Sequence, residues 1–126
     1  MQTAFENGAI YINSARLGAD ADYRRHPTFS GVYIKSLIAY DKSERRLNAM
    51  LVKIDPRCEI GDHLHDKEYE LHQIIGGEAE AIIDGKSVAY KAGVVSLIAP
   101  NVKHSVKALE AGAVLLAVFT PNLTRL

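Results

Sequence analysis

The chain has 126 residues, 48% of them hydrophobic and 24% charged, a composition typical of one globular domain with its own core. Its 15 basic and 15 acidic residues give a formal net charge of +0. A balanced charge argues against nucleic acid as a partner, because phosphate binding normally needs a basic excess or stripe.

Residues 1–31 form the least regular segment, and we expect an N-terminal arm of the same domain with a short strand near Ala9–Asn13. At most one helical turn is expected, around residues 14–23. The segment lacks the basic start and apolar stretch of a signal peptide, and the longest apolar run, residues 113–119, is too short to span a bilayer. The single cysteine, Cys58, cannot form a disulfide framework. We therefore expect a cytoplasmic protein with no membrane partner and Cys58 as a partly buried thiol.

Short β-type segments separated by turn residues follow the arm. Asp55-Pro56, Gly76-Gly77 and Asp84-Gly85 are turn signals, the last of them typical of a tight hairpin. Strands of this length with no sustained helical period predict an all-β sandwich or barrel. The expected strands cover residues 32–40, 47–54, 69–75, 78–83, 86–90, 94–98, 103–109 and 113–120, and residues 121–126 are expected to form a C-terminal tail.

The stretch GDHLHDKEYELHQIIGG, residues 61–77, contains three of the five histidines. His63 and His65 are two residues apart, so in extended chain both imidazoles point to the same face. A turn after His65 would bring Glu70 back toward the pair, and His104, after a Pro-Asn turn on another segment, is the best fourth ligand. Imidazole and carboxylate groups together suit a divalent transition metal. The alternative is a solvated loop followed by a strand.

These spacings resemble the two conserved motifs of the cupins. His63-x-His65, four residues, Glu70, six residues and Gly77 match the first motif, and Gly93, five residues and the stretch APNVKH ending at His104 match the second. The resemblance covers roughly residues 32–120. It implies an all-β single cupin barrel of the double-stranded β-helix or jelly-roll type, preceded by the N-terminal arm, with these four residues as metal ligands. Similar barrels can also keep such histidines without a functional metal.

The chain departs from the cupin pattern outside the ligands. Arg57 stands where a glycine is usual, Ala99 and Asn101 replace a proline and a glycine, and Ala108 replaces an asparagine. None of these changes removes a ligand. Asn101 can still adopt the left-handed backbone conformation that the turn needs.

Other residues are expected near the ion. His72 shares the face of Glu70, and could donate to a metal ligand, shuttle protons or contact substrate; the alternative is an ordinary cavity histidine. Leu115, Ala117 and Phe119 share one face and should form an apolar wall of the substrate cavity. His26 is expected at the surface, and Tyr33 and Tyr40 in barrel packing.

The residues of the last predicted strand bear on one specific activity. Residues 114–121 resemble the final strand of small cupins that open unsaturated uronate rings in pectin and alginate breakdown, in which an Asp, a Phe and an Arg face the metal. The corresponding residues here are Ala117, Phe119 and Leu123. Because only the phenylalanine is kept, we do not expect that activity.

The resemblance implies one divalent metal, Mn, Fe, Ni, Co or Zn. It implies an enzyme of dioxygenase or isomerase/lyase type for a small oxygenated organic substrate. The alternative is a non-catalytic cupin that binds or senses a small ligand. Small cupins commonly pair through the outer sheet and the N-terminal strand, and both faces of residues 113–120 are apolar, so we expect a homodimer.

Overall fold

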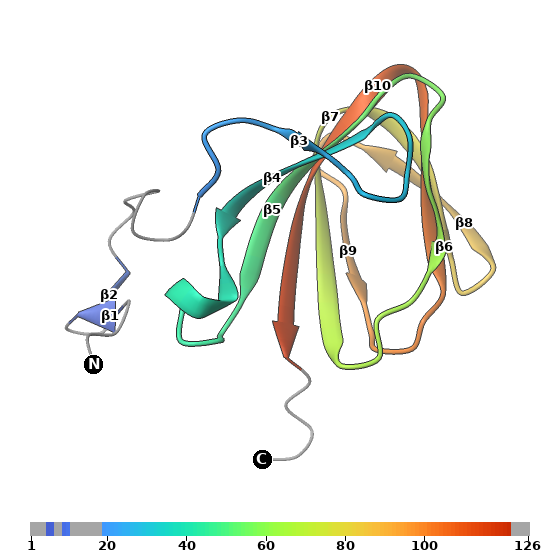
Figure 1. Cartoon of the computed structure of the whole chain (residues 1–126). Helices are drawn as coiled ribbons and strands as arrows, with labels where there is room; N and C mark the ends of the chain where they lie inside the picture. Colours follow the sequence, from blue (N-terminus) through green and yellow to red (C-terminus); the bar gives the residue numbers. More distant parts are fainter. Residues whose placement is uncertain (1–4, 7–8, 11–18, 122–126) are drawn as a thin grey trace.

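The computed structural model describes residues 5–6, 9–10 and 19–121, and their fold is all-β, as predicted (Figure 1). β1 (Phe5–Glu6) and β2 (Ala9–Ile10) form a small antiparallel pair. The main sheet consists of β3 (Arg24–Arg25), β4 (Val32–Ile38), β5 (Asn48–Ile54), β6 (Glu59–His63), β7 (Glu68–Ile83), β8 (Lys86–Lys91), β9 (Val95–Ile98) and β10 (His104–Pro121). No helix of this described part is long and apolar enough to cross a membrane.

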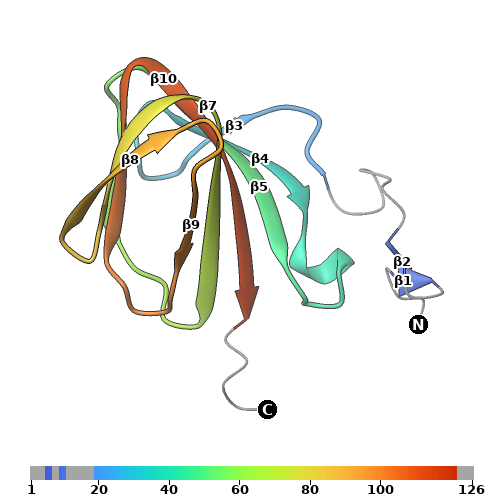
Figure 2. The same ribbon diagram turned by 180° about the vertical axis from the view of Figure 1, so that it is seen from behind.

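Two long strands, β7 and β10, organise the barrel because the two halves of each strand pair with different neighbours. The first half of β7 pairs with β9, and the second half of β10 pairs with β5, which continues into β4 and β3. The second half of β7 pairs with β8, and the first half of β10 pairs with β6. In Figure 1 the orange half of β10 accordingly lies with β6 while its red half runs beside β5, and Figure 2 gives the view from behind. The sheet thus folds over on itself around an interior.

Glycines allow each of these long strands to bend in the middle and to pair with different strands on either side of the bend. The sequence predicts that strands end at Gly76-Gly77 and at Gly112, but both strands bend there and continue. Gly77 has φ 68° and Gly112 has φ 73°, and a Cβ on Gly77 would lie 2.0 Å from the carbonyl oxygen of Gly112. Only residues without side chains allow the two backbones to meet this closely. The predicted strand ends are therefore wrong at these positions, and the same glycines mark bends.

The predicted turn at Asp84-Gly85 is a two-residue hairpin between β7 and β8, and both residues have positive φ, 52° and 77°. Asn101 has φ 67°, so it does adopt the left-handed conformation. Arg57, at the other position where glycine is usual, has φ 61°. Its guanidinium lies 2.7 Å from the carboxylate of Glu110.

Some expected elements differ. The first residues of the predicted strand Ala9–Asn13 form β2, and residues 11–13 lie outside the described part. Of the predicted helical turn, residues 14–18 lie outside it and residues 19–23 are not helical; the helical turn found is the 3-10 turn η1 (Tyr40–Lys42). β6 was not predicted, and neither was β3, which adds part of the expected arm to the edge of the sheet.

Alternating residues of the central strands fill the interior. Residues of β7 and β10 that face inward are almost fully buried, and Val32, Val52 and Ile54 join them from β4 and β5. The inward residues of β7 and β10 include Ile74, Ala79, Ala81, Val106, Ala108, Ala113, Leu115, Ala117 and Phe119. Cys58 is partly buried and packs against this core as a free thiol. The small side chains leave room for a cavity inside the folded sheet.

Candidate metal centre

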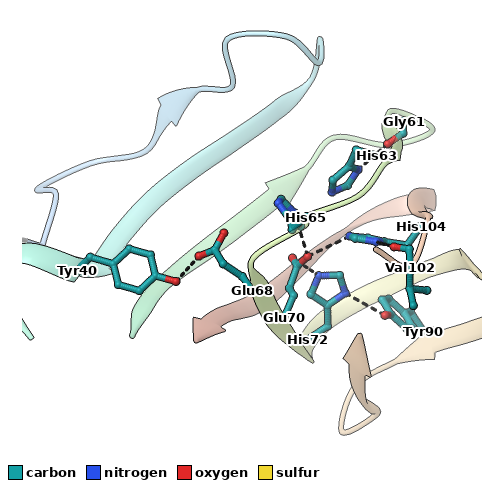
Figure 3. Close-up of polar contacts among 10 residues, drawn as sticks. All are labelled: Tyr40, Gly61, His63, His65, Glu68, Glu70, His72, Tyr90, Val102 and His104. Atoms are coloured by element: carbon teal, nitrogen blue, oxygen red, sulfur yellow. Dashed lines mark hydrogen bonds and ion pairs between the residues drawn. The ribbon is translucent and has the colours of Figure 1, made fainter. Parts of the chain in front are cut away.

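Four predicted ligands meet at one place. His63 is the last residue of β6, His65 lies in the segment between β6 and β7, Glu70 is on β7 and His104 begins β10. One possible ligand atom from each lies within 4.8 Å of the others (Figure 3). Pairing of β6 with β10 makes His63 and His104 register partners.

Backbone carbonyls fix the orientation of two of the rings. Nδ1 of His63 lies 2.8 Å from the carbonyl oxygen of Gly61, and Nδ1 of His104 lies 2.9 Å from that of Val102. Since a carbonyl can only accept, Nδ1 carries the hydrogen in both rings, and the neutral imidazole has its lone pair on Nε2. Histidine usually binds metal in this form, with one ring nitrogen donating a hydrogen bond and the other offering its lone pair.

Glu70 supplies the negative charge among these lone pairs. Its Oε1 lies 3.0 Å from Nε2 of His104 and 3.3 Å from Nε2 of His65. A neutral His104 has no hydrogen on Nε2, so this close contact is attractive only if a cation, a proton or a metal ion, is shared between the atoms. Nε2 of His65 is buried and makes no hydrogen bond within the described part of the chain. The donor set therefore fits a divalent metal ion.

The pKa shifts favour the ligating forms at two positions. Burial raises the pKa of Glu70, but contacts with His104, His65 and His72 outweigh burial and hold it well below its usual range. Burial lowers the pKa of His63 and so favours its neutral form. The pKa of His65 is raised, chiefly by its contact with Glu70. Protons therefore compete with a metal more strongly at His65 than at His63.

His72 does not belong to the group of four, and it lies beside Glu70, as expected. It is buried, its Nε2 lies 2.6 Å from Oε2 of Glu70, and its Nδ1 lies 2.9 Å from the hydroxyl of Tyr90. Tyr90 had not been singled out in the sequence. No sequence pattern reveals this contact, because Tyr90 lies on β8, 18 residues further along the chain.

A cavity of about 350 Å³ opens onto the group. The expected wall residues Leu115, Ala117 and Phe119 line it, and the ring of Phe119 meets that of His65 edge to face at a centroid distance of 5.1 Å. Further apolar lining comes from Phe29, Ile34, Met50, Val52, Ile60 and Leu64. Among the described residues, no Arg or Lys lines this cavity. Contact of these residues with a substrate stays a prediction.

The β3–β4 loop forms a part of the wall that sequence reasoning missed. His26, expected at the surface, is half-buried and lines the cavity, so that expectation is wrong. Its Nδ1 accepts hydrogen bonds from the backbone N–H groups of Thr28 at 3.0 Å and Phe29 at 3.2 Å. The Phe29 ring stands between His26 and His63, at centroid distances of 4.8 and 6.2 Å. The sequence signal that could have indicated this part of the wall was Phe29, an aromatic residue in an otherwise polar loop.

Tyr40 and Glu68 support the site from outside. The Tyr40 hydroxyl donates a hydrogen bond to the carboxylate of Glu68, which joins η1 to the first residue of β7 (Figure 3). Burial, together with this contact, raises the pKa of Tyr40. The bond fixes the start of the strand that carries Glu70.

Comparison with known proteins decides the family. The family model of the cupin domain matches residues 50–119, more than half of the chain. This chain belongs to the cupins. The match contains all four residues of the candidate metal centre. No curated protein matches this cupin in sequence.

Solved structures resemble this cupin in fold at low sequence identity. A "predicted oxalate decarboxylase" from Thermotoga maritima is 22% identical with a TM-score of 0.74, over 90% of this chain and 100% of that one. KdgF from Halomonas sp. is 19% identical with a TM-score of 0.70, over 82% and 88%. Oxalate decarboxylase from Bacillus subtilis is 24% identical with a TM-score of 0.67, over 81% of this chain and 27% of that longer one. Together they support the barrel fold predicted from the sequence.

Proposed function

We propose that this cupin is a metal-dependent enzyme that acts on a small oxygenated organic substrate, as an oxygenase or as an isomerase or lyase. The observation that carries the proposal is the convergence of three imidazoles and one carboxylate beside a cavity of about 350 Å³, which His63, His65 and Glu70 line. Pockets of this size accept small molecules. A site that only stabilised the fold would have no need of an adjoining cavity.

His63, His65, Glu70 and His104 would hold the ion. A divalent transition metal, when bound, supplies Lewis acidity and, if it is Fe or Mn, redox chemistry. Bacillus subtilis oxalate decarboxylase has Mn(II) centres, which makes Mn(II) the first metal to assay. With three neutral ligands and one carboxylate, the site keeps a net positive charge that attracts substrate oxygens.

The cavity wall narrows the substrate class. Because no Arg or Lys of the described chain lines the cavity, a carboxylate or phosphate distant from the ion would find no counter-charge there. The apolar lining suits a substrate with hydrocarbon at one end and two neighbouring oxygens at the other, such as a hydroxy-ketone, an enediol or a carboxylate next to the ion. The similarity in fold to oxalate decarboxylases keeps a lyase reaction among the candidates.

The same wall favours a second candidate, a non-catalytic cupin that binds or senses a small ligand. Away from the metal ligands and His72, the ionisable side chain lining the cavity among the described residues is His26. General acid–base chemistry would have few groups to use there. Binding without turnover would need none.

The first experiment is to identify the element in the purified protein. Metal-loaded and metal-stripped protein are then screened for dioxygen uptake, and for isomerisation or decarboxylation of hydroxy-ketones, enediols and short carboxylates. Turnover that needs the metal supports the enzyme. Saturable ligand binding without turnover favours the sensing alternative, and full activity after removal of the metal would contradict the proposal.

A further inference from the structure

Tyr90, His72 and Glu70 form a buried chain of hydrogen bonds that leads away from the candidate metal centre. Their relative exposures are 0%, 2% and 5%. Nε2 of His72 lies 2.6 Å from Oε2 of Glu70, and Nδ1 of His72 lies 2.9 Å from the hydroxyl of Tyr90. In Figure 3 His72 lies between Glu70 and Tyr90, on the opposite side of the carboxylate from His63.

The direction of each hydrogen bond follows from the partners. An ionised carboxylate only accepts, so Nε2 of His72 carries the hydrogen and donates it to Glu70. In the neutral imidazole Nδ1 then has a lone pair, which accepts from the Tyr90 hydroxyl. Burial raises the pKa of Tyr90, which keeps its proton available for this bond. Ser96, which lies opposite His72 in the pairing of β7 with β9, lowers the pKa of Tyr90, but burial outweighs this effect.

This arrangement separates the two oxygens of Glu70. Oε2 is held by His72, while Oε1 faces Nε2 of His65 and of His104. We propose that His72 and Tyr90 are positioning residues that hold Glu70 so that it offers a single oxygen, Oε1, to the metal. The proposal rests on the metal site of the proposed function. A carboxylate that binds through one oxygen takes one coordination position rather than two, which leaves more of the ion open to substrate.

The same bonds argue against a direct role of His72 in proton transfer to substrate. Although His72 lines the cavity, both of its ring nitrogens already have partners, Glu70 and Tyr90. A proton shuttle needs one nitrogen free to reach the substrate. His72 therefore acts through Glu70.

Three variants test the proposal through Mn²⁺ affinity, measured by calorimetry, and through the visible spectrum of the Co²⁺ form. His72→Leu removes both hydrogen bonds, and we expect Mn²⁺ affinity to fall about 10- to 100-fold, with a changed Co²⁺ spectrum as Oε2 becomes free. His72→Gln keeps an N–H donor and should retain most of the affinity. Tyr90→Phe removes one oxygen and should cause a smaller loss than His72→Leu.

Two matched controls separate positioning from general damage. Ile74→Ala alters a buried residue on the same face of β7 with no contact to Glu70, so it should lower stability and leave Mn²⁺ affinity native-like. Tyr33→Phe removes the phenol oxygen of a ring whose centroid lies 4.8 Å from Nζ of Lys53, and it should change neither stability nor Mn²⁺ affinity. Native-like Mn²⁺ affinity and Co²⁺ spectrum in His72→Leu would overturn the positioning role alone. Failure of the native protein to bind Mn²⁺ or Co²⁺ would reject the proposed function as well.

A metal-free measurement tests the chain even if His72→Leu does not fold. Nitrogen-15 NMR of the native histidine rings should show His72 with the hydrogen on Nε2 and a bare Nδ1. Tyr90→Phe should shift the Nδ1 signal of His72 and leave that of His26 unchanged. A hydrogen on Nδ1 of native His72, or an Nδ1 signal insensitive to Tyr90→Phe, would overturn the assignment.

Discussion

His63 and His104 are register partners across β6 and β10, and their ring centroids lie 4.2 Å apart. Two charged imidazolium rings at this distance would repel each other. Each ring instead donates its Nδ1 hydrogen to a backbone carbonyl, so both can stay neutral with lone pairs in the same region. Only a cation, a proton or a metal ion, makes that arrangement favourable.

Removing one of these lone pairs should abolish metal binding. We expect His104→Ala to lose more metal affinity than the about 10- to 100-fold typical of residues that only orient a ligand, and to lose turnover with it. The readouts are metal content after dialysis and calorimetric titration. Ser105→Ala, on the next residue of β10, should behave as the native protein does. Retained metal and activity in His104→Ala would rule out the proposed ligand set.

Metal affinity should depend on pH in a defined direction. Contact with Glu70 raises the pKa of His65, so His65 binds its proton more tightly than an ordinary histidine does. Metal needs the neutral ring; affinity should therefore be highest above this pKa and fall as the pH drops through it, by about tenfold per pH unit for each competing proton. Burial lowers the pKa of His63, so that ring competes only at lower pH. Competition with a chelator between about pH 5.5 and 8 measures the slope.

Substitution of His65 is the control for that slope. His65→Ala should bind metal more weakly at high pH and should show a flatter dependence near neutral pH. His26→Gln lies outside the group of four and should keep the native slope. An affinity that does not change with pH would be inconsistent with histidine ligation.

Two adjacent glycines should respond very differently to alanine. A Cβ on Gly77 would lie 2.0 Å from the carbonyl oxygen of Gly112, and Gly77 has φ 68°. We expect Gly77→Ala to cost about 1–3 kcal/mol from backbone strain, with the collision adding to it. A Cβ on Gly76 would meet nothing within 4 Å, so Gly76→Ala should change stability by less than about 1 kcal/mol. Urea unfolding of the metal-free proteins compares them, and equal effects would contradict the close approach of β7 and β10.

The outer face of the sheet should form a homodimer, as we propose from its apolar character. Leu116 pairs with Leu51 on this partly exposed face, and Leu97 on β9 is 68% exposed. Leu116→Arg should convert a dimer into monomers in sedimentation at micromolar concentration, because a buried unpaired charge opposes association. Leu109→Arg, an equally polar change near the bend of β10, should leave the dimer intact. A native monomer at that concentration would contradict the proposal.

Local sequence patterns determined the all-β fold class and part of the metal-ligand group. Tight-turn residues such as Asp84-Gly85 and short β segments indicate an all-β fold, because hairpin geometry depends on the residues of the turn itself. The two-residue spacing of His63 and His65 places both rings on one face of extended chain, whatever the rest of the fold does. The resemblance of these spacings to the cupin motifs then predicted the group of four that the structure brings together.

Only the tertiary structure decided how the site is supported and enclosed. Contact between Tyr90 and His72 depends on the way β8 pairs with β7. His26 lines the cavity because Phe29 of the same loop lies beside Gly61 and His63 of β6. The glycines of β7 and β10 look like turn residues in the sequence. In the structure the two backbones meet closely at these glycines, so the strands bend there and do not end. Such contacts join residues far apart in the chain, where register and burial rather than local preference determine which side chains meet.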